Sequence, residues 1–391
     1  MMNAIKIFFD IRRHTEEKRK EFYFNCVLGI FTLICLTIFK NTSLGQESIN
    51  WWFDKYISWQ VKDEISSEIV FLDFDNTSML ELNRPSITPR DKVADLVKIA
   101  YEGGAKIIIL DFEFSDADYS PEKFIASDEF ALDGETRDKV LYNLLQTISD
   151  DTSTNTKILL LGSTYADMSK KKNIFSSLID EKKIYEVTPN FSQNSEGDRN
   201  IRFWLPYLKI KNSTTNEKSL LWSLPIMTLA LTLGNVNELH LLEKVILSDL
   251  DNSATEYSLS IVRQGVKEYF IVNKEIYIDN GVIRDTQSNK YNRIQYTLIP
   301  NVFNGNIPPN QIGHWRKNGI DNERLDCRNK IVIIGRADDD CNDIYSTPVR
   351  NMPGMYIHGN AIETVLSDTR PHLTSTFKNL VLEITLIVIV S

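Results

Sequence analysis

Residues 68–75, EIVFLDFD, and residues 106–111, KIIILD, decide the fold class of this chain. Each is a run of apolar residues that ends in carboxylates, which is typical of a strand buried on both faces of a parallel sheet. Between them, Thr88-Pro89-Arg90-Asp91 has the residue types of a helix start, with Thr88 as the cap and Pro89 at the first helical position. The two runs therefore predict a β-α-β unit.

The same alternation of strands and helices continues along the chain. Apolar residues at helical spacing follow Pro89, and Gly103-Gly104 predicts the end of that helix. Further strands are predicted at 157–162 and 330–335, and further helices at 136–150, 219–233 and 357–366. From about His240 to Pro300, short alternating pieces predict β structure instead. We therefore expect an α/β fold, with a mainly parallel central sheet flanked by helices and a β-rich insertion.

An apolar segment lies near each end of the chain. Residues 22–39, FYFNCVLGIFTLICLTIF, contain no charged residue, and a membrane helix needs about 20 apolar residues. No small-residue cleavage site follows, which favours an uncleaved anchor over a secretory signal. The second stretch, LVLEITLIVIV at 380–390, is shorter and has Glu383 within it. We interpret residues 377–391 as the incomplete start of a second transmembrane helix, with a buried core helix as the alternative.

Basic residues indicate an orientation for the first segment. Only Lys40 follows it closely, whereas several basic residues precede it: Lys6, Arg12, Arg13, Lys18, Arg19 and Lys20. Cytoplasmic flanks of membrane helices carry an excess of lysine and arginine. We therefore expect residues 1–21 to be a cytoplasmic basic tail, residues 22–39 a transmembrane helix, and residues 40–376 one extracytoplasmic domain.

Composition narrows the range of partners. The formal net charge is −9, and no basic stripe lies outside the N-terminal tail, which argues against nucleic acid as a partner. Cys26 and Cys35 fall in the first apolar segment, and Cys327 and Cys341 in the polar region. Their spacing does not fit a zinc site. The second pair is compatible with a disulfide after export or with two free thiols.

Several blocks occur in a distinctive order. ITPR at 87–90 and GGAKIIILDFEFS at 103–115 come first, and the region closes with KIVIIG at 330–335, Asp343 and MPGMYIHGNA at 352–361. Together they resemble the type-2 CHASE domain, the extracellular sensory domain associated with bacterial adenylate cyclases and histidine kinases. The chain departs from that family at Asn83-Arg84-Pro85, where a tryptophan-proline pair is common.

The resemblance implies a membrane-anchored, periplasmic sensor of a bacterial signalling receptor, in a single-pass or multi-pass protein of the inner membrane. It implies that an unknown signal passes through membrane helices to an output module. No kinase, cyclase, phosphodiesterase or cofactor motif is present in the sequence. The expected partners are an unknown small ligand or cation, the lipid bilayer, and either a second copy of the chain or a separate cytosolic output protein.

Acidic residues at the ends of predicted strands form the candidate ligand-binding site. Asp73, Asp75, Asp111 and Asp343 each follow an apolar strand, and the carboxyl ends of parallel strands lie at one edge of a sheet. Carboxylates gathered there repel one another unless a cation, an arginine or protonation relieves them. Arg90, in the first helical turn, is the expected internal partner. A structural salt bridge explains the same residues without a ligand, and both interpretations stay open.

An enzymatic alternative comes from FLDFDNT at 71–77, which fits the hhDxDxT pattern of haloacid-dehalogenase-like phosphatases. In that interpretation Asp73 is the nucleophile and Asp75 the general acid/base of a Mg²⁺-dependent phosphohydrolase. However, aspartate and threonine also close strands in many α/β proteins, and a clear phosphate-binding lysine ahead of the later acidic block is lacking. We therefore favour a sensor without catalytic activity.

Overall fold

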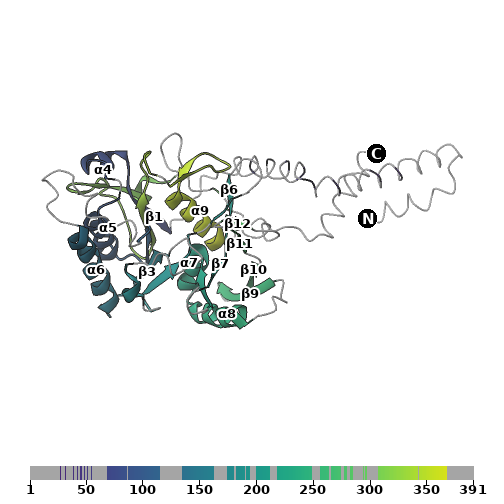
Figure 1. Cartoon of the computed structure of the whole chain (residues 1–391). Coiled ribbons are helices and arrows are strands. Elements are labelled where there is room, and N and C mark those ends of the chain that lie inside the picture. The colour runs from purple at the N-terminus through teal and green to yellow at the C-terminus, as the bar shows by residue number, and fades with distance from the viewer. Residues whose placement is uncertain are drawn as a thin grey trace. The chain divides into compact units, whose positions relative to one another are not determined.

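Figure 1 shows the computed structural model of the chain. It describes residues 68–114, 134–162, 174–193, 200–211, 218–248 and 307–367, with gaps at 86, 180–181, 190 and 342, as well as parts of 256–296 and isolated positions up to residue 54. The chain divides into two units, residues 57–371 and a second unit of residues 1–56 with 372–391.

The two predicted membrane segments, 22–39 and 377–391, lie outside the described residues except for Val27, Phe31 and Ile38. None of the helices in the described part of the chain combines the length and the hydropathy that a bilayer span requires.

A seven-stranded sheet forms the centre of the unit 57–371. In spatial order its strands are β14 (Gly319–Ile320), β13 (Ile312–Arg316), β1 (Ile69–Phe74), β15 (Ile331–Arg336), β2 (Ile107–Asp111), β3 (Lys157–Leu161) and β4 (Ile184–Val187). All neighbouring pairs are parallel except β13 and β14. This confirms the predicted α/β class. The strand β15 lies between β1 and β2, so the first two strands of the chain are not neighbours.

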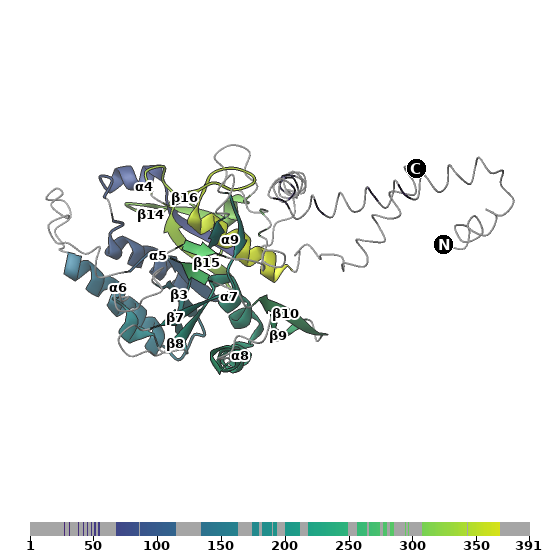
Figure 2. The ribbon, with the colours of Figure 1, turned by 45° about the vertical axis from the view of Figure 1, so that its right-hand side comes forward.

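Helices cover both faces of the sheet. As Figures 1 and 2 show, α5 (Arg90–Glu102) and α6 (Gly134–Asp150) lie on one face, and α7 (Leu224–Leu233) and α9 (Gly354–Leu366) on the other. Along β1, Val70 and Leu72 belong to the core on the α5 and α6 side, whereas Ile69 and Phe71 belong to the core on the α9 side. Burial on both faces is the reason why the strand is continuously apolar.

The predicted start of α5 was wrong by one residue. Pro89 is the N-cap, without a side-chain cap bond, and Arg90 is the first helical residue. The proline ring fixes φ but leaves ψ free, and Pro89 has an extended ψ of 126°. Thr88 is therefore not the cap. The predicted end was confirmed, because Gly103 caps the helix and Gly104 adopts a left-handed φ of 77°.

The predicted helix at 219–233 was also too long. Its first residues form β8 (Lys218–Trp222), which pairs antiparallel with β7 (Tyr207–Lys211). The helix α7 starts at Leu224, and Pro225 lies in the first turn, where its missing N–H needs no partner.

The β-rich insertion begins later than predicted, because the helix α8 (Val236–Ser248) extends past His240. Leu239 and Ile246 are buried while Leu241 and Val245 are exposed, so apolar residues on two faces obscure the helical period. After this helix, the antiparallel pairs β9 (Glu256–Arg263) with β10 (Val266–Asn273) and β11 (Tyr277–Asp279) with β12 (Val282–Arg284) show the expected β structure.

The remaining elements are short. They are α4 (Asn76–Glu81), the 3₁₀ turns η4 (Ser176–Leu178) and η5 (Pro309–Gln311), and the strands β5 (Phe191–Gln193), β6 (Ile201–Trp204), β16 (Ile344–Tyr345) and β17 (Met352–Pro353). Cys327 and Cys341 are buried free thiols, which decides between the two states that the sequence left open.

Candidate functional site

The strand register places a row of residues at the carboxyl edge of the sheet. Asp73 of β1 is paired with His314 of β13 on one side and with Gly335 of β15 on the other. Gly335 is in turn paired with Asp111 of β2. Paired residues of neighbouring strands share a face, and the residue two before Asp73, Phe71, belongs to the core beneath α9. The row therefore faces α9.

The first turns of α9 lie against this row. A Cβ atom at Gly335 would lie 2.9 Å from the Cβ of Met355, so a glycine is needed where the helix approaches the sheet. On one side of that contact, the Tyr356 hydroxyl donates a hydrogen bond of 2.6 Å to Asp73. On the other side, His358 Nε2 lies 3.5 Å from Asp111 Oδ1. One helix thus contacts both acids of the row.

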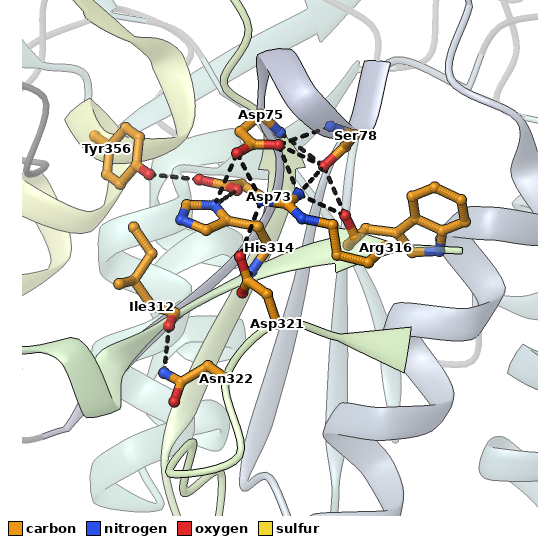
Figure 3. A network of polar contacts seen from close by, with 10 residues as sticks. Asp73, Asp75, Ser78, Ile312, His314, Arg316, Asp321, Asn322 and Tyr356 are labelled. Atoms are coloured by element: carbon orange, nitrogen blue, oxygen red, sulfur yellow. Dashed lines mark hydrogen bonds and ion pairs between the residues drawn. The ribbon is translucent and has the colours of Figure 1, made fainter. Parts of the chain in front are cut away.

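Asp73 belongs to a charge-compensated group that we call the paired cluster: Asp73, Asp75, Ser78, His314 and Arg316. The Asp73 carboxylate is 1% exposed and lies between Tyr356 and His314, as Figure 3 shows. His314 Nδ1 is 2.5 Å from its Oδ1. Burial alone would lower the pKa of His314, but the hydrogen bond and charge of Asp73, with the charges of Asp75 and Asp321, raise it to about 9. His314 is therefore a cation at neutral pH.

Asp75 is the second acid of the paired cluster and the N-cap of α4. The Ser78 amide and hydroxyl donate to it at 2.8 and 2.7 Å. Arg316 donates from both of its terminal nitrogens, at 2.7 and 3.0 Å, and also to Asp321 at 2.9 Å. Burial would raise the pKa of Asp75, but the bonds from Arg316 and Ser78 lower it to about 2. Two-pronged arginine bonds of this kind fix an ionised carboxylate in place.

Asp111 and Asp343, which we call the acid pair, have very different surroundings. Burial raises the pKa of Asp111 well above its ordinary value, and the charge of Asp343 adds to this. Burial also raises the pKa of Asp343, to about 6, although the Tyr345 hydroxyl and the Gly354 N–H lower it. Neither carboxyl has a lysine or arginine ion pair among the residues that the structure describes.

The comparison with protein families agrees with this architecture: the CHASE2 domain model matches residues 30–391. The chain belongs to the CHASE2 domain family. These domains are extracellular sensory domains, so the resemblance noted in the sequence is confirmed. The chain matches no curated protein and no solved structure.

The edge of this CHASE2 domain brings four of the five predicted site residues together in two groups, Asp73 with Asp75 and Asp111 with Asp343. The arginine that pairs with Asp75 is Arg316, which the sequence interpretation did not single out.

Arg90 makes its own contacts between α5 and α6. Its Nε lies 3.5 Å from Asp138, and its guanidinium lies 4.5 Å from the centre of the Phe114 ring. A second ion pair between the same two helices joins Arg137 to Asp91 at 3.7 Å. The two Arg-Asp dipeptides thus exchange partners, which ties the N-terminal turns of both helices together.

The CHASE2 site also contains residues that the sequence interpretation missed. His314 and Arg316 are two apart on β13, so the strand period places them on one face. Tyr356 lies in the family-like block at 352–361. Recognising that HWR at 314–316 is a parallel strand next to β1 would have pointed to these partners.

The geometry does not support Asp73 as a phosphatase nucleophile. A nucleophile must reach its substrate, yet both oxygens of the buried Asp73 carboxylate are occupied, by Tyr356 and His314. In the described part of the chain, no group of histidine, cysteine, aspartate and glutamate side chains is arranged to hold a metal ion.

Proposed function

We propose that this CHASE2 domain is the membrane-anchored, extracytoplasmic sensor domain of a bacterial signalling receptor. It receives an unknown signal, a small ligand or cation, and passes it through membrane helices to an output module that this sequence does not contain. Membership of a sensory family supports the sensor role. The apolar segments at 22–39 and 377–391 and the basic residues before the first of them support the anchor and its orientation.

The observation that carries the proposal is the position of α9. Its first turns contact Asp73 of the paired cluster and Asp111 of the acid pair. Along the chain, the residues after Leu366 lead to the second apolar segment. A change of charge or occupancy at the carboxyl edge therefore acts on the helix that precedes that segment. A ligand shifts a protein towards the conformation that it binds better. The polar contacts of α9 with Asp73 and Asp111 would change in strength when a ligand binds at this edge, so α9 is suited to such a shift.

Thermal unfolding of the full chain in detergent micelles tests ligand binding at this edge. A panel of metal cations and small polar metabolites is added at constant pH, and a ligand of the folded state raises the melting temperature. We expect Asp111→Asn to remove that rise while the variant remains folded. The matched control is Asp150→Asn, which changes an exposed carboxyl at the end of α6. A panel that leaves the wild-type melting temperature unchanged contradicts a small-ligand site at this edge.

A further inference from the structure

The acid pair lies against a single turn of α9. Gly354 and His358 are four residues apart and so share one face of the helix. The Asp343 carboxyl packs so closely on Gly354 that a Cβ there would lie 2.2 Å from Asp343 Oδ2. One turn later, His358 Nε2 lies 3.5 Å from Asp111 Oδ1. Both carboxyls are therefore held between the end of the sheet and the first turns of α9.

Among the residues that the structure describes, the groups that surround the pair carry no compensating positive charge. The strand β15 contributes Gly335, the partner of Asp111 in the sheet. The strand β3 contributes the apolar Leu161, which follows Leu160, the partner of Leu110. The segment that includes β16 contributes Tyr345 and Cys341; burial raises the pKa of both, that of Cys341 to about 11, so both are neutral. Arg336, whose charge acts on Cys341, is hydrogen-bonded to Asp338 at 2.9 Å.

The group that α9 contributes, His358, is neutral as well. Burial lowers its pKa to about 3. Its Nδ1 is buried and has no hydrogen-bond partner in the described part of the chain, and its ring centre lies 4.5 Å from that of Phe191. A distance of 3.5 Å is long for a hydrogen bond, so the approach of Nε2 to Asp111 is a weak polar contact between neutral groups. His358 does not neutralise a negative charge on the pair.

The Asp111 side chain is buried and Asp343 is half-buried, and the described residues supply no cation to either. The two carboxyls therefore resist simultaneous ionisation at neutral pH, because each charge raises the cost of the other. Asp343 lies at the N-terminus of α9, where the helix dipole favours an anion. Asp111 has no such help. Asp343 therefore loses its proton first, and Asp111 retains one to higher pH, in agreement with the upward shift of the Asp111 pKa, to which burial and the charge of Asp343 both contribute.

We propose that Asp111 and Asp343 form a proton-binding switch that fastens α9 to the sheet when the compartment around the domain becomes acidic. With both carboxyls protonated, the helix packs on a neutral surface. When Asp343 ionises, a half-buried negative charge lies against the first turn of α9, and the docked helix becomes less stable relative to an undocked one. The inference rests on the proposed sensor function and names the proton as its signal.

Amide hydrogen exchange of the full chain in detergent micelles measures how often α9 opens. Rates for peptides within 354–366 are corrected for the intrinsic effect of pH. With a folded pKa of about 6 for Asp343 against an ordinary 3.8, the opening constant of α9 is expected to rise about tenfold between about pH 5 and about pH 7. Asp343→Asn, which is neutral at every pH, should abolish this rise. Asp150→Asn should retain it.

Infrared spectroscopy keeps the test decisive if Asp343→Asn fails to fold. At about pH 7 the wild-type chain should show the carbonyl band of a protonated, buried carboxylic acid, and lowering the pH to about 5 should add to it. The Asp111→Asn variant should lack the band seen at neutral pH. Exchange in α9 that does not change with pH, or the absence of a protonated carboxyl band at about pH 7, overturns the proposal. A metabolite that stabilises the chain while exchange in α9 ignores pH would retain the sensor function and exclude the proton as its signal.

Discussion

Asp73 and Asp111 occupy the same level of the sheet, two strands apart, with Gly335 between them. Asp73 is next to β13, which supplies the protonated His314, whereas Asp111 is next to β3, which supplies leucines. Among the described residues, the same residue type at the same register therefore has a cationic partner in one place and none in the other. Charge compensation at this edge depends on which strand is the neighbour. Only the acid pair, which has no cationic partner among the described residues, can respond to a modest change in its surroundings.

The acid pair can respond to external conditions only if the domain faces outward, and the orientation of the domain is the largest effect to measure. Lys98 is exposed on α5. Labelling of Lys98→Cys by a membrane-impermeant thiol reagent should be essentially complete in intact spheroplasts, because the native Cys327 and Cys341 are buried and compete little. The wild-type chain is the control for background. Labelling that appears only after lysis would place the domain in the cytoplasm.

Removal of a partner residue should destabilise the paired cluster more than the acid pair. His314→Ala leaves the buried Asp73 without its cation, and removing one member of a buried pair costs about 3 kcal/mol or more. Tyr356→Phe removes one hydrogen bond to the same carboxylate and should cost about 1.5–3 kcal/mol. Chemical denaturation of both variants gives the comparison. If Tyr356→Phe is the more damaging change, the cation is not what stabilises Asp73.

The paired cluster and the acid pair should also differ in the pH range over which they change the free energy of unfolding. For His314, a pKa raised to about 9 contributes stability that is complete below about 6.5 and is lost as the pH rises through 9. For Asp75, a pKa lowered to about 2 contributes stability that is present above about 3.8 and is lost as the pH falls through 2. Neither group changes its contribution between those limits.

The acid pair changes its contribution inside that interval. Because the pKa of Asp343 is raised to about 6, the free energy of unfolding falls as the pH rises from about 3.8 to 6, with a limiting slope of about 1.4 kcal/mol per pH unit. Asp343→Asn should therefore gain stability relative to wild type over this range, whereas His314→Gln should not. Unfolding curves at several pH values measure both. Parallel curves for wild type and Asp343→Asn would show that this carboxyl titrates normally.

The smallest expected effect concerns catalysis. Because Asp73 is buried and both of its oxygens are bonded, Asp73→Asn should leave Mg²⁺-dependent hydrolysis of a generic phosphoester at background, as in the wild type. Wild-type turnover well above background that disappears in a folded Asp73→Asn variant would restore the phosphatase interpretation.

The sequence predicted the elements that are apolar along their whole length. Three fully buried runs became β1, β2 and β15, and the acids that end or follow them lie at one edge of the sheet, as expected. Such runs are informative because a strand that is buried on both faces of a parallel sheet is apolar along nearly its whole length. The boundary between β8 and α7 was not predicted, since an apolar stretch with an early proline suits either a strand or the first turn of a helix.

The partners of the acids were beyond a local pattern. Asp73 and His314 are separated by 241 residues, and β13 is a short, half-buried strand with no apolar run to mark it. The contrast between Asp73 and Asp111 could not be anticipated either, because both residues follow similar apolar strands. It depends on strand order, which the periodicity of a single strand does not encode.

The insertion of β15 between β1 and β2 also has a consequence for how this domain is made. Until the ribosome has passed residue 336, the first two strands leave a gap whose edges expose unpaired backbone groups, and such edges invite aggregation. The sheet closes only with the last of its strands in chain order. The dominance of such distant pairings is expected to make folding slow. Nascent chains that terminate before residue 331 should therefore accumulate in inclusion bodies or be degraded, and a chaperone that holds the growing polypeptide would be most useful in this interval.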